Sequence, residues 1–111
     1  MVTRMKIQRG EIWLVNLDPT VGSEIQKTRP CVVISPPEMH DYLHTAIVAP
    51  MSTGSYAAPF RIPVRFMRKE GLILLDQIRA IDKMRLVRKL GVISPVALDA
   101  TLTTLGELFN K

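Results

Sequence analysis

The sequence has a single cysteine, few aromatic residues and no long apolar run. With one cysteine, Cys31, among 111 residues, an intrachain disulfide and a cysteine-rich zinc site are both excluded. No apolar segment approaches the roughly 20 residues that a membrane-spanning helix requires. Residues 1–7 carry charge without the apolar core of a signal peptide. We therefore expect one cytoplasmic domain, residues 1–111, that makes no contact with a membrane.

Positive charge exceeds negative charge, and the excess is regional. The chain has 15 Lys and Arg against 10 Asp and Glu, a formal net charge of +5. Residues 61–91 contain nine bases and three acids, so this region carries +6 and the remainder −1. Such a region suits a polyanion, because phosphate contacts release counterions. The alternative is a solvated strand edge kept soluble by Lys and Arg, and charge alone modestly favours the polyanion.

Short apolar runs separated by turn residues predict a mainly β protein. We expect strands over residues 11–17, 29–35, 45–51, 60–66, 71–80 and 86–93. The run 61–66 alternates polar and apolar residues and contains Pro63, which is typical of an edge strand. The unbroken apolar run 72–75 indicates a strand buried on both faces.

The end of the chain changes to a helical pattern. Ser94 suits a helix N-cap and Pro95 the first helical position. Apolar residues then recur at helical spacing and are expected in the core: Leu98, Leu102, Leu105 and Leu108 or Phe109. The intervening threonines are weak helix formers, so packing must stabilise this helix. The predicted fold is α+β but mainly β, a small and strongly bent antiparallel barrel with a C-terminal helix.

Polar residues gather in the connection between the first two predicted strands. Turn-forming residues, Asp18, Pro19 and Gly22, punctuate this connection. Its other polar side chains are those of Glu24, Lys27, Thr28 and Arg29. A loop of this kind can hold the carboxylate of Glu24 and the guanidinium of Arg29 at one phosphate, as in an active site.

Six short motifs follow one another along the chain. They lie at residues 9–13 (Arg-Gly-Glu-Ile-Trp), 17–20 (Leu-Asp-Pro-Thr), 22–24 (Gly-Ser-Glu), 28–30 (Thr-Arg-Pro), 49–53 (Ala-Pro-Met-Ser-Thr) and 76–79 (Asp-Gln-Ile-Arg). In this order they resemble the PemK/MazF-like toxin endoribonucleases of bacterial type II toxin–antitoxin pairs, and the resemblance covers essentially the whole chain. It implies an SH3-like barrel that forms a homodimer, with a substrate groove across the dimer interface.

The resemblance also implies an activity and a second partner. The family cleaves single-stranded RNA, including mRNA, at short sequences without a metal or other cofactor, and so inhibits translation and growth. The 2′-hydroxyl attacks the adjacent phosphorus, which leaves a 2′,3′-cyclic phosphate and a 5′-hydroxyl. A cognate antitoxin, through an acidic and largely disordered segment, normally occupies the groove and blocks it.

Arg29 is the strongest candidate for a catalytic residue. A planar guanidinium can bind two equatorial oxygens of the phosphorane-like transition state at once, and it cannot act as a base because it stays protonated. By spacing, Ser52 is the matching hydroxyl, where the family commonly has Thr, and Thr53 remains an alternative. Either hydroxyl could instead cap the turn before Gly54.

Two carboxylates compete for the role of general base. Glu24 is the nearest in sequence to Arg29, although a neighbouring guanidinium lowers a carboxyl pKa and weakens it as a base. Asp76 is the competitor, because the PemK subgroup uses an arginine-x-aspartate arrangement there. In this chain the corresponding arginine and histidine positions hold Leu74 and Ser23, which favours the MazF-like arrangement. Asp76 would then bind a base edge or anchor Gln77 and Arg79.

Several other side chains are candidates for RNA binding. Gln77 and Arg79 can read or stack on splayed bases, and Tyr56 offers a stacking surface. Lys27 and Thr28 flank Arg29 and complete the predicted RNA-binding set. Trp13 could stack as well, but a core or interface position is the better interpretation.

A metal site is a weak alternative in this sequence. His40 and His44 lie four residues apart with Asp41 between them, but Pro36 and Pro37 make a regular helix doubtful. We therefore expect a surface loop, with one helical turn over residues 37–43 as the helical alternative. Cys31 follows Arg29 and Pro30 on an apolar strand and is expected in the core.

Two other classes of protein compete with the ribonuclease. One is a non-catalytic SH3-like module that binds nucleic acid through its basic region. The other is a gyrase-directed toxin of similar fold, which would lack the catalytic set. The presence of Glu24, Arg29 and Ser52 together favours an RNA-cleaving enzyme.

Overall fold

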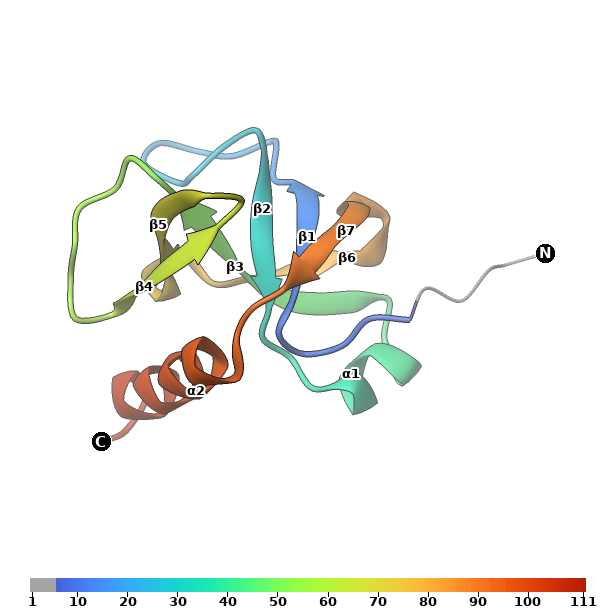
Figure 1. Cartoon of the computed structure of the whole chain (residues 1–111). Helices are drawn as coiled ribbons and strands as arrows, with labels where there is room; N and C mark the ends of the chain where they lie inside the picture. The colour runs from blue at the N-terminus through green and yellow to red at the C-terminus, as the bar shows by residue number, and fades with distance from the viewer. Residues whose placement is uncertain (1–5) are drawn as a thin grey trace.

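The computed structural model describes residues 6–111 as a curled antiparallel sheet with two α-helices (Figure 1). Its strands are β1 (Glu11–Asn16), β2 (Thr28–Val33), β3 (Thr45–Ser52), β4 (Arg61–Phe66), β5 (Lys69–Leu74), β6 (Arg79–Asp82) and β7 (Leu86–Val92). The helices are α1 (Pro37–Tyr42) and α2 (Pro95–Leu108), with 3₁₀ turns η1 (Leu75–Gln77) and η2 (Lys83–Arg85). Within the described residues, neither α-helix is long and apolar enough to cross a membrane.

Six of the seven strands lie in the order β4-β5-β3-β2-β1-β7, and the seventh, β6, pairs with β3 outside this order. The expected mainly β fold with a C-terminal helix is therefore confirmed, and Pro63 lies on the edge strand β4 as predicted. The single strand predicted over 71–80 is wrong. The turn η1 divides it, so that β5 pairs with the end of β3 and β6 with its beginning.

Alternate residues of the central strands enter two separate cores. Along β1 and β2, the side chains of Trp13 and Cys31 belong to one buried cluster, and those of Ile12 and Val32 belong to the other. This is the two-residue period of a sheet covered on both faces. Cys31 and Trp13 are core residues, as expected, and burial raises the pKa of the Cys31 thiol to about 12.

The helix α2 covers the second cluster below the β4–β5 hairpin (Figure 1). Its N-cap is as predicted, since the Ser94 hydroxyl accepts a hydrogen bond from the Ala97 amide at 3.1 Å. Half-buried leucines pack on the sheet as far as Leu105. Leu108 and Phe109 are 41% and 69% exposed, so the predicted apolar stripe is wrong at its end.

The helical turn expected over residues 37–43 is present as α1, but its His40 is buried and does not lie on the surface as expected. The ring Nδ1 lies 2.9 Å from the Ile7 carbonyl oxygen and Nε2 lies 2.6 Å from the Ser35 hydroxyl. Pro37 opens this helix at a position where a missing amide hydrogen costs nothing. Both ring nitrogens of His40 are therefore engaged in hydrogen bonds within the fold. Residues 6–111 contain no cluster of three or more metal-ligating side chains.

The motif at residues 9–13 ties the sheet to α2. Gly10 adopts φ +90°, which favours glycine, and its amide donates to Val33 O at 2.8 Å. Its carbonyl accepts from Ile93 N at 2.9 Å, immediately before the helix. A Cβ on Gly10 would lie 3.3 Å from Leu98, so the small residue also allows close packing of α2.

Glu11 is a buried carboxylate held by three donors. Its Oε1 accepts from Gln8 N at 2.9 Å and from Trp13 Nε1 at 3.0 Å, and its Oε2 lies 3.0 Å from Lys89 Nζ. Burial alone would raise the pKa of Glu11, but these hydrogen bonds and the Lys89 charge outweigh it and lower the pKa. The carboxylate thereby joins β1 to β7.

We expect Glu11 to contribute stability that disappears in acid. Because the pKa is lower in the folded chain, the contribution is complete above the unfolded value of about 4.3 and is lost as pH falls through the folded value. Glu11→Gln should cost on the order of 1 kcal/mol at pH 7 and flatten the decline in unfolding free energy below about pH 5. Urea titrations at several pH values measure this. Glu70→Gln, in a loose exposed pair with Arg65, is the control, and parallel profiles for wild type and Glu11→Gln would contradict the assignment.

Candidate active site

The pairing of β2 with β3 brings Arg29 and Ser52 to the same end of the sheet. Antiparallel partners in this pair are Val33 and Val48, Val32 and Ala49, and Cys31 and Pro50. The pairing ends at Cys31 and Pro50, and Arg29 and Ser52 each lie two residues beyond that last pair. Residues 23 positions apart in the sequence thereby line the same cavity.

Arg29, Ser52 and Thr53 line one cavity of about 300 Å³, which we call the Arg29–Ser52 cavity. Its opposite wall is the β4–β5 hairpin, whose tip reaches toward the start of β2 (Figure 1). The lining residues from this hairpin are Val64, Phe66, Met67, Lys69 and Gly71. In the described part of the chain, this lining has two cationic and two hydroxyl side chains and no carboxylate. Such a site can hold an anion.

The polar groups of this cavity are oriented by short local contacts. Arg29 Nε donates to Gln26 O at 2.9 Å, which fixes the base of the guanidinium. The Ser52 hydroxyl oxygen accepts from Gly54 N at 3.2 Å and from the Ser55 hydroxyl at 2.9 Å. Ser52 therefore does cap the turn, and with both contacts directed at its oxygen, its own hydrogen can be donated to an anion.

Glu24, Asp76, Gln77 and Arg79 line a different cavity, of about 540 Å³, which we call the Glu24–Gln77 cavity. Gln77 Oε1 accepts from Ile25 N at 2.7 Å and so attaches the connection 17–27 to η1. Glu24 Oε1 accepts from Val21 N at 2.7 Å within the connection. Glu24 and Arg29 thus line different cavities in this structure, and the connection turns Glu24 toward η1.

Asp76 forms a two-point ion pair with Arg61, a residue that the sequence analysis missed. Arg61 Nε and Nη2 lie 3.0 and 2.9 Å from the two carboxylate oxygens. The hydrogen bonds and positive charge of Arg61 outweigh partial burial and lower the pKa of Asp76. Arg61 also donates to Tyr56 O at 2.9 Å, so the pair braces the connection 53–60. Only the pairing of β4 with β5 brings these groups together.

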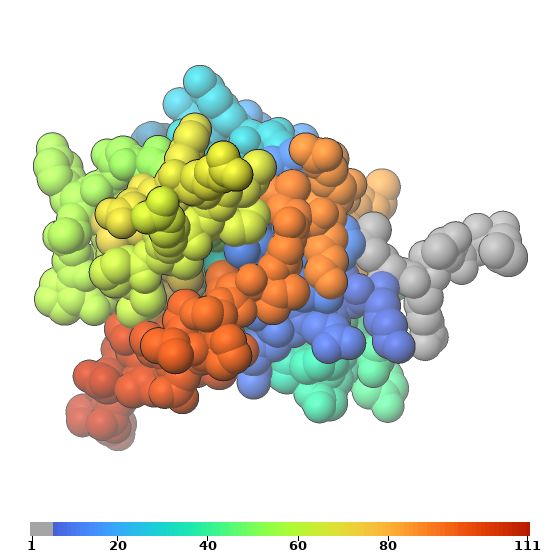
Figure 2. Space-filling model, in the orientation of Figure 1, coloured from blue at the N-terminus to red at the C-terminus, as the bar shows by residue number. Residues whose placement is uncertain are grey.

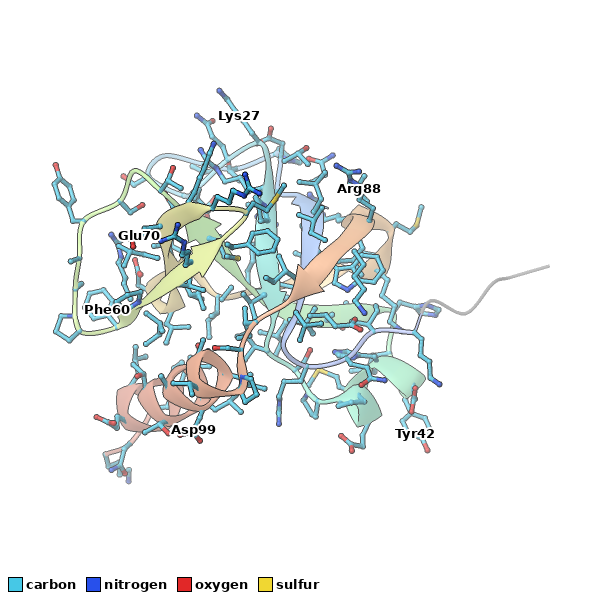
Figure 3. All side chains as sticks on the ribbon, viewed as in Figure 1. Lys27, Tyr42, Phe60, Glu70, Arg88 and Asp99 are labelled. Carbon is cyan, nitrogen blue, oxygen red and sulfur yellow. The ribbon has the colours of Figure 1, made fainter. Side chains whose placement is uncertain are left out.

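The remaining predicted RNA-binding residues lie around these cavities. Arg79 Nη1 donates to Leu17 O at 3.0 Å, which anchors the guanidinium beside the connection 17–27. Tyr56 is 88% exposed, and neither it nor Lys27 nor Thr28 lines either cavity. Figure 3 shows Lys27 at the end of the molecule formed by this connection. No motif of the sequence pointed to the hairpin residues of the Arg29–Ser52 cavity, for which Gly71 was the only local signal.

Gly71 allows the hairpin to approach the end of β3. A Cβ at this position would lie 2.8 Å from Ser52 O and 3.5 Å from Thr53 Cγ2. The carbonyl is backbone and cannot move without shifting β3. The absence of a side chain at Gly71 therefore sets the width of the Arg29–Ser52 cavity.

The molecule is thus a small, curled antiparallel sheet with two cavities. One is lined by cations and hydroxyls, and the other contains carboxylates, an amide and Arg79. A family model of PemK-like, MazF-like toxins of type II toxin–antitoxin systems matches residues 8–109. The chain belongs to this family.

Relatives and solved structures agree with this assignment. The endoribonuclease toxin MazF of Escherichia coli K12 is 32% identical over 111 residues, which are 99% of this chain and 100% of that protein. The endoribonuclease PemK of Escherichia coli is 37% identical over 81 residues, 68% of this chain and 61% of PemK. A crystal structure of MazF from Deinococcus radiodurans superposes with a TM-score of 0.83 at 23% identity, covering 94% of this chain and 96% of that one. A MazE–MazF structure from Deinococcus radiodurans gives 0.78 at 19% identity, covering 96% and 97%.

We expect Gly71→Ala to destabilise the fold and displace Ser52. The added methyl group meets a backbone oxygen, and overpacking of this kind costs about 1–3 kcal/mol. Thermal unfolding gives the stability, and the amide chemical shifts of Ser52 and Thr53 report the displacement. Gly54→Ala is the matched control, because nothing lies within 4 Å of a Cβ there. Equal effects of the two substitutions would contradict the close approach.

Proposed function

We propose that the protein is a cytoplasmic, sequence-specific endoribonuclease toxin that cleaves single-stranded RNA, mRNA included, and thereby inhibits translation and growth. Family membership supports the activity, since the relatives are endoribonucleases by name. The observation that carries the proposal is the shared cavity of Arg29 and Ser52. Its two cations, without a carboxylate in the lining, suit the phosphodiester backbone that every RNA presents.

In the proposed reaction the RNA 2′-oxygen attacks the neighbouring phosphorus. The O2′–P bond forms as the P–O5′ bond breaks, the 2′-hydroxyl proton passes to a base, and the leaving 5′-oxygen is protonated to a hydroxyl. The products are a 2′,3′-cyclic phosphate and a 5′-hydroxyl end. Arg29 stabilises the negative charge that builds on the equatorial oxygens, and Ser52 donates its hydroxyl hydrogen to one of them. Thr53, in the same lining, is the alternative hydroxyl.

Glu24 is our proposed proton acceptor. Asp76 is less suited, because both of its oxygens are engaged by Arg61 and its lowered pKa makes it a weak base. Glu24 engages one oxygen with a backbone amide of its own connection. Bound RNA must draw this carboxylate from the Val21 amide toward the ribose for the step to occur.

The bases of the RNA are proposed to enter the Glu24–Gln77 cavity. With the carbonyl oxygen of Gln77 held by Ile25, its amide hydrogens can be donated to a base edge, and Arg79 can donate or stack. Lys27 and Thr28 would bind backbone at the same end of the molecule, and Tyr56 would stack on a flanking base. Asp76 would position Tyr56 through Arg61, which binds both residues.

We also propose a homodimer and a cognate antitoxin as partners. Solved relatives include a MazE–MazF complex and an endoribonuclease in complex with its cognate antitoxin. An acidic antitoxin segment would be complementary to the excess of Lys and Arg in residues 61–91.

The first test is cleavage of a mixed-sequence RNA and its DNA counterpart in the presence of a chelator. We expect RNA fragments with cyclic phosphate ends and intact DNA. Arg29→Ala should lower kcat by about 10²–10³-fold, as loss of a transition-state donor does, with RNA binding changed only a few-fold. Ser52→Ala should act in the same direction and exceed Thr53→Val.

Arg88→Ala is the control, since this arginine of β7 lines neither cavity. RNA binding without cleavage by the wild type would instead favour a non-catalytic binding module. Cleavage that stops on chelation would contradict a metal-independent mechanism.

A second test identifies the base from the pH dependence of kcat. If Glu24 accepts the proton, Glu24→Gln should lower kcat by about 10²-fold and remove the acid limb of the profile. Asp76→Asn should keep the acid limb but lower the melting temperature, because it leaves Arg61 without its charged partner. The reverse pattern would assign the base to Asp76.

A further inference from the structure

The β4–β5 hairpin contributes a cation that no motif of the sequence singled out. Lys69 is the first residue of β5, lies opposite Phe66 in the register, and lines the Arg29–Ser52 cavity with it. It is exposed, and its ammonium group makes no salt bridge or hydrogen bond with any of residues 6–111. A cation without a protein partner beside Arg29 is available for a ligand.

The next pair of the hairpin provides an internal comparison. Arg65 lies opposite Glu70, and the two form a loose exposed pair at 3.8 Å. Because adjacent residues of a strand point to opposite faces, this pair faces away from the Arg29–Ser52 cavity and lines a separate one. Figure 3 shows Glu70 on the outer side of the hairpin. Next to the turn, the two strands thus carry a paired cation, Arg65, on one face and a cation without a partner among residues 6–111, Lys69, on the other.

The turn that positions Lys69 is strained. Met67 and Arg68 connect the strands with φ values of +52° and +63°. Two positive φ angles in a two-residue hairpin turn define the type I′ geometry, in which Asn and Gly are preferred. A side chain in this region costs roughly 1 kcal/mol or more, and such strain concentrates at functional sites. In this hairpin the two-residue turn connects Phe66 to Lys69, and Met67 of the turn also lines the Arg29–Ser52 cavity.

We propose that Lys69 binds a backbone phosphate of the RNA next to the scissile one, opposite Arg29. The inference rests on the proposed function and extends it, because it makes the hairpin the second wall of the RNA-binding groove. A lysine ammonium acts on phosphate as a point charge, so its contribution is to binding and not to the geometry of the transition state. Lys69 is a binding residue, and Arg29 remains the catalytic one.

The test measures how salt affects binding of a single-stranded deoxyoligonucleotide of mixed sequence, which cannot be cleaved. Each phosphate contact to a single strand contributes about −0.7 to the slope of log K against log salt. Lys69→Gln should reduce the slope magnitude by about that amount and weaken binding about 3–10-fold at low salt, uniformly across sequences. Lys69→Arg should keep the slope, and Arg65→Gln, of equal charge change on the opposite face, should leave it unchanged.

Cleavage of RNA by the same variants separates this inference from the function on which it rests. We expect Lys69→Gln to raise KM while kcat stays within about twofold, with an unchanged melting temperature. If the wild type cleaves RNA but Lys69→Gln and Arg65→Gln give the same slope, the Lys69 site is wrong and the enzyme assignment stands. If Lys69→Gln reduces the slope of log K against log salt but the wild type cleaves no RNA, the phosphate site stands and the ribonuclease assignment fails.

Discussion

The antiparallel register of β2 on β3 is the constraint on which the site depends. Three buried pairs, from Cys31 and Pro50 to Val33 and Val48, fix this register. A slip of one residue would reverse every side chain of β2, placing Arg29 on the other face and core residues in solvent. The hydrophobic cost of that exchange secures the register. Packing residues that take no part in the proposed chemistry therefore determine which hydroxyl side chains line the cavity of Arg29.

The break between β5 and β6 produces the two cavities. At η1 the chain leaves the end of β3, turns, and rejoins the same strand at its beginning. The residues before the turn form the hairpin wall of the Arg29–Ser52 cavity, and those at and after it line the Glu24–Gln77 cavity. The space-filling view shows the hairpin between the start of β2 above and α2 below (Figure 2). The ion pair of Arg61 with Asp76 joins η1 to the start of β4.

Periodic features could be predicted from the sequence, because alternation and caps are local. The edge position of Pro63 and the capped start of α2 are examples. The division of 71–80 could not be predicted, since the apolar run continues into η1 and contains no Gly or Pro at the break. The burial of His40 and the partner of Asp76 depend on residues 33 and 15 positions away, which no local pattern specifies.

Glu24 and Arg29 line different cavities, and this placement too could not be predicted from a local sequence pattern. Lys27, which lies between Glu24 and Arg29 in the sequence, has a positive φ of 72°, a conformation that cannot be predicted from a lysine. The two cavities consequently lie on different elements. Strand ends and a hairpin carry the cations and hydroxyls of the Arg29–Ser52 cavity, whereas the connection 17–27, η1 and the start of β6 carry the carboxylates, the amide and Arg79 of the Glu24–Gln77 cavity. On the proposed function, the phosphate is common to every nucleotide and needs a fixed site, while base choice varies. Changes in the connection could then alter the RNA sequence that is read and leave the cleavage chemistry intact.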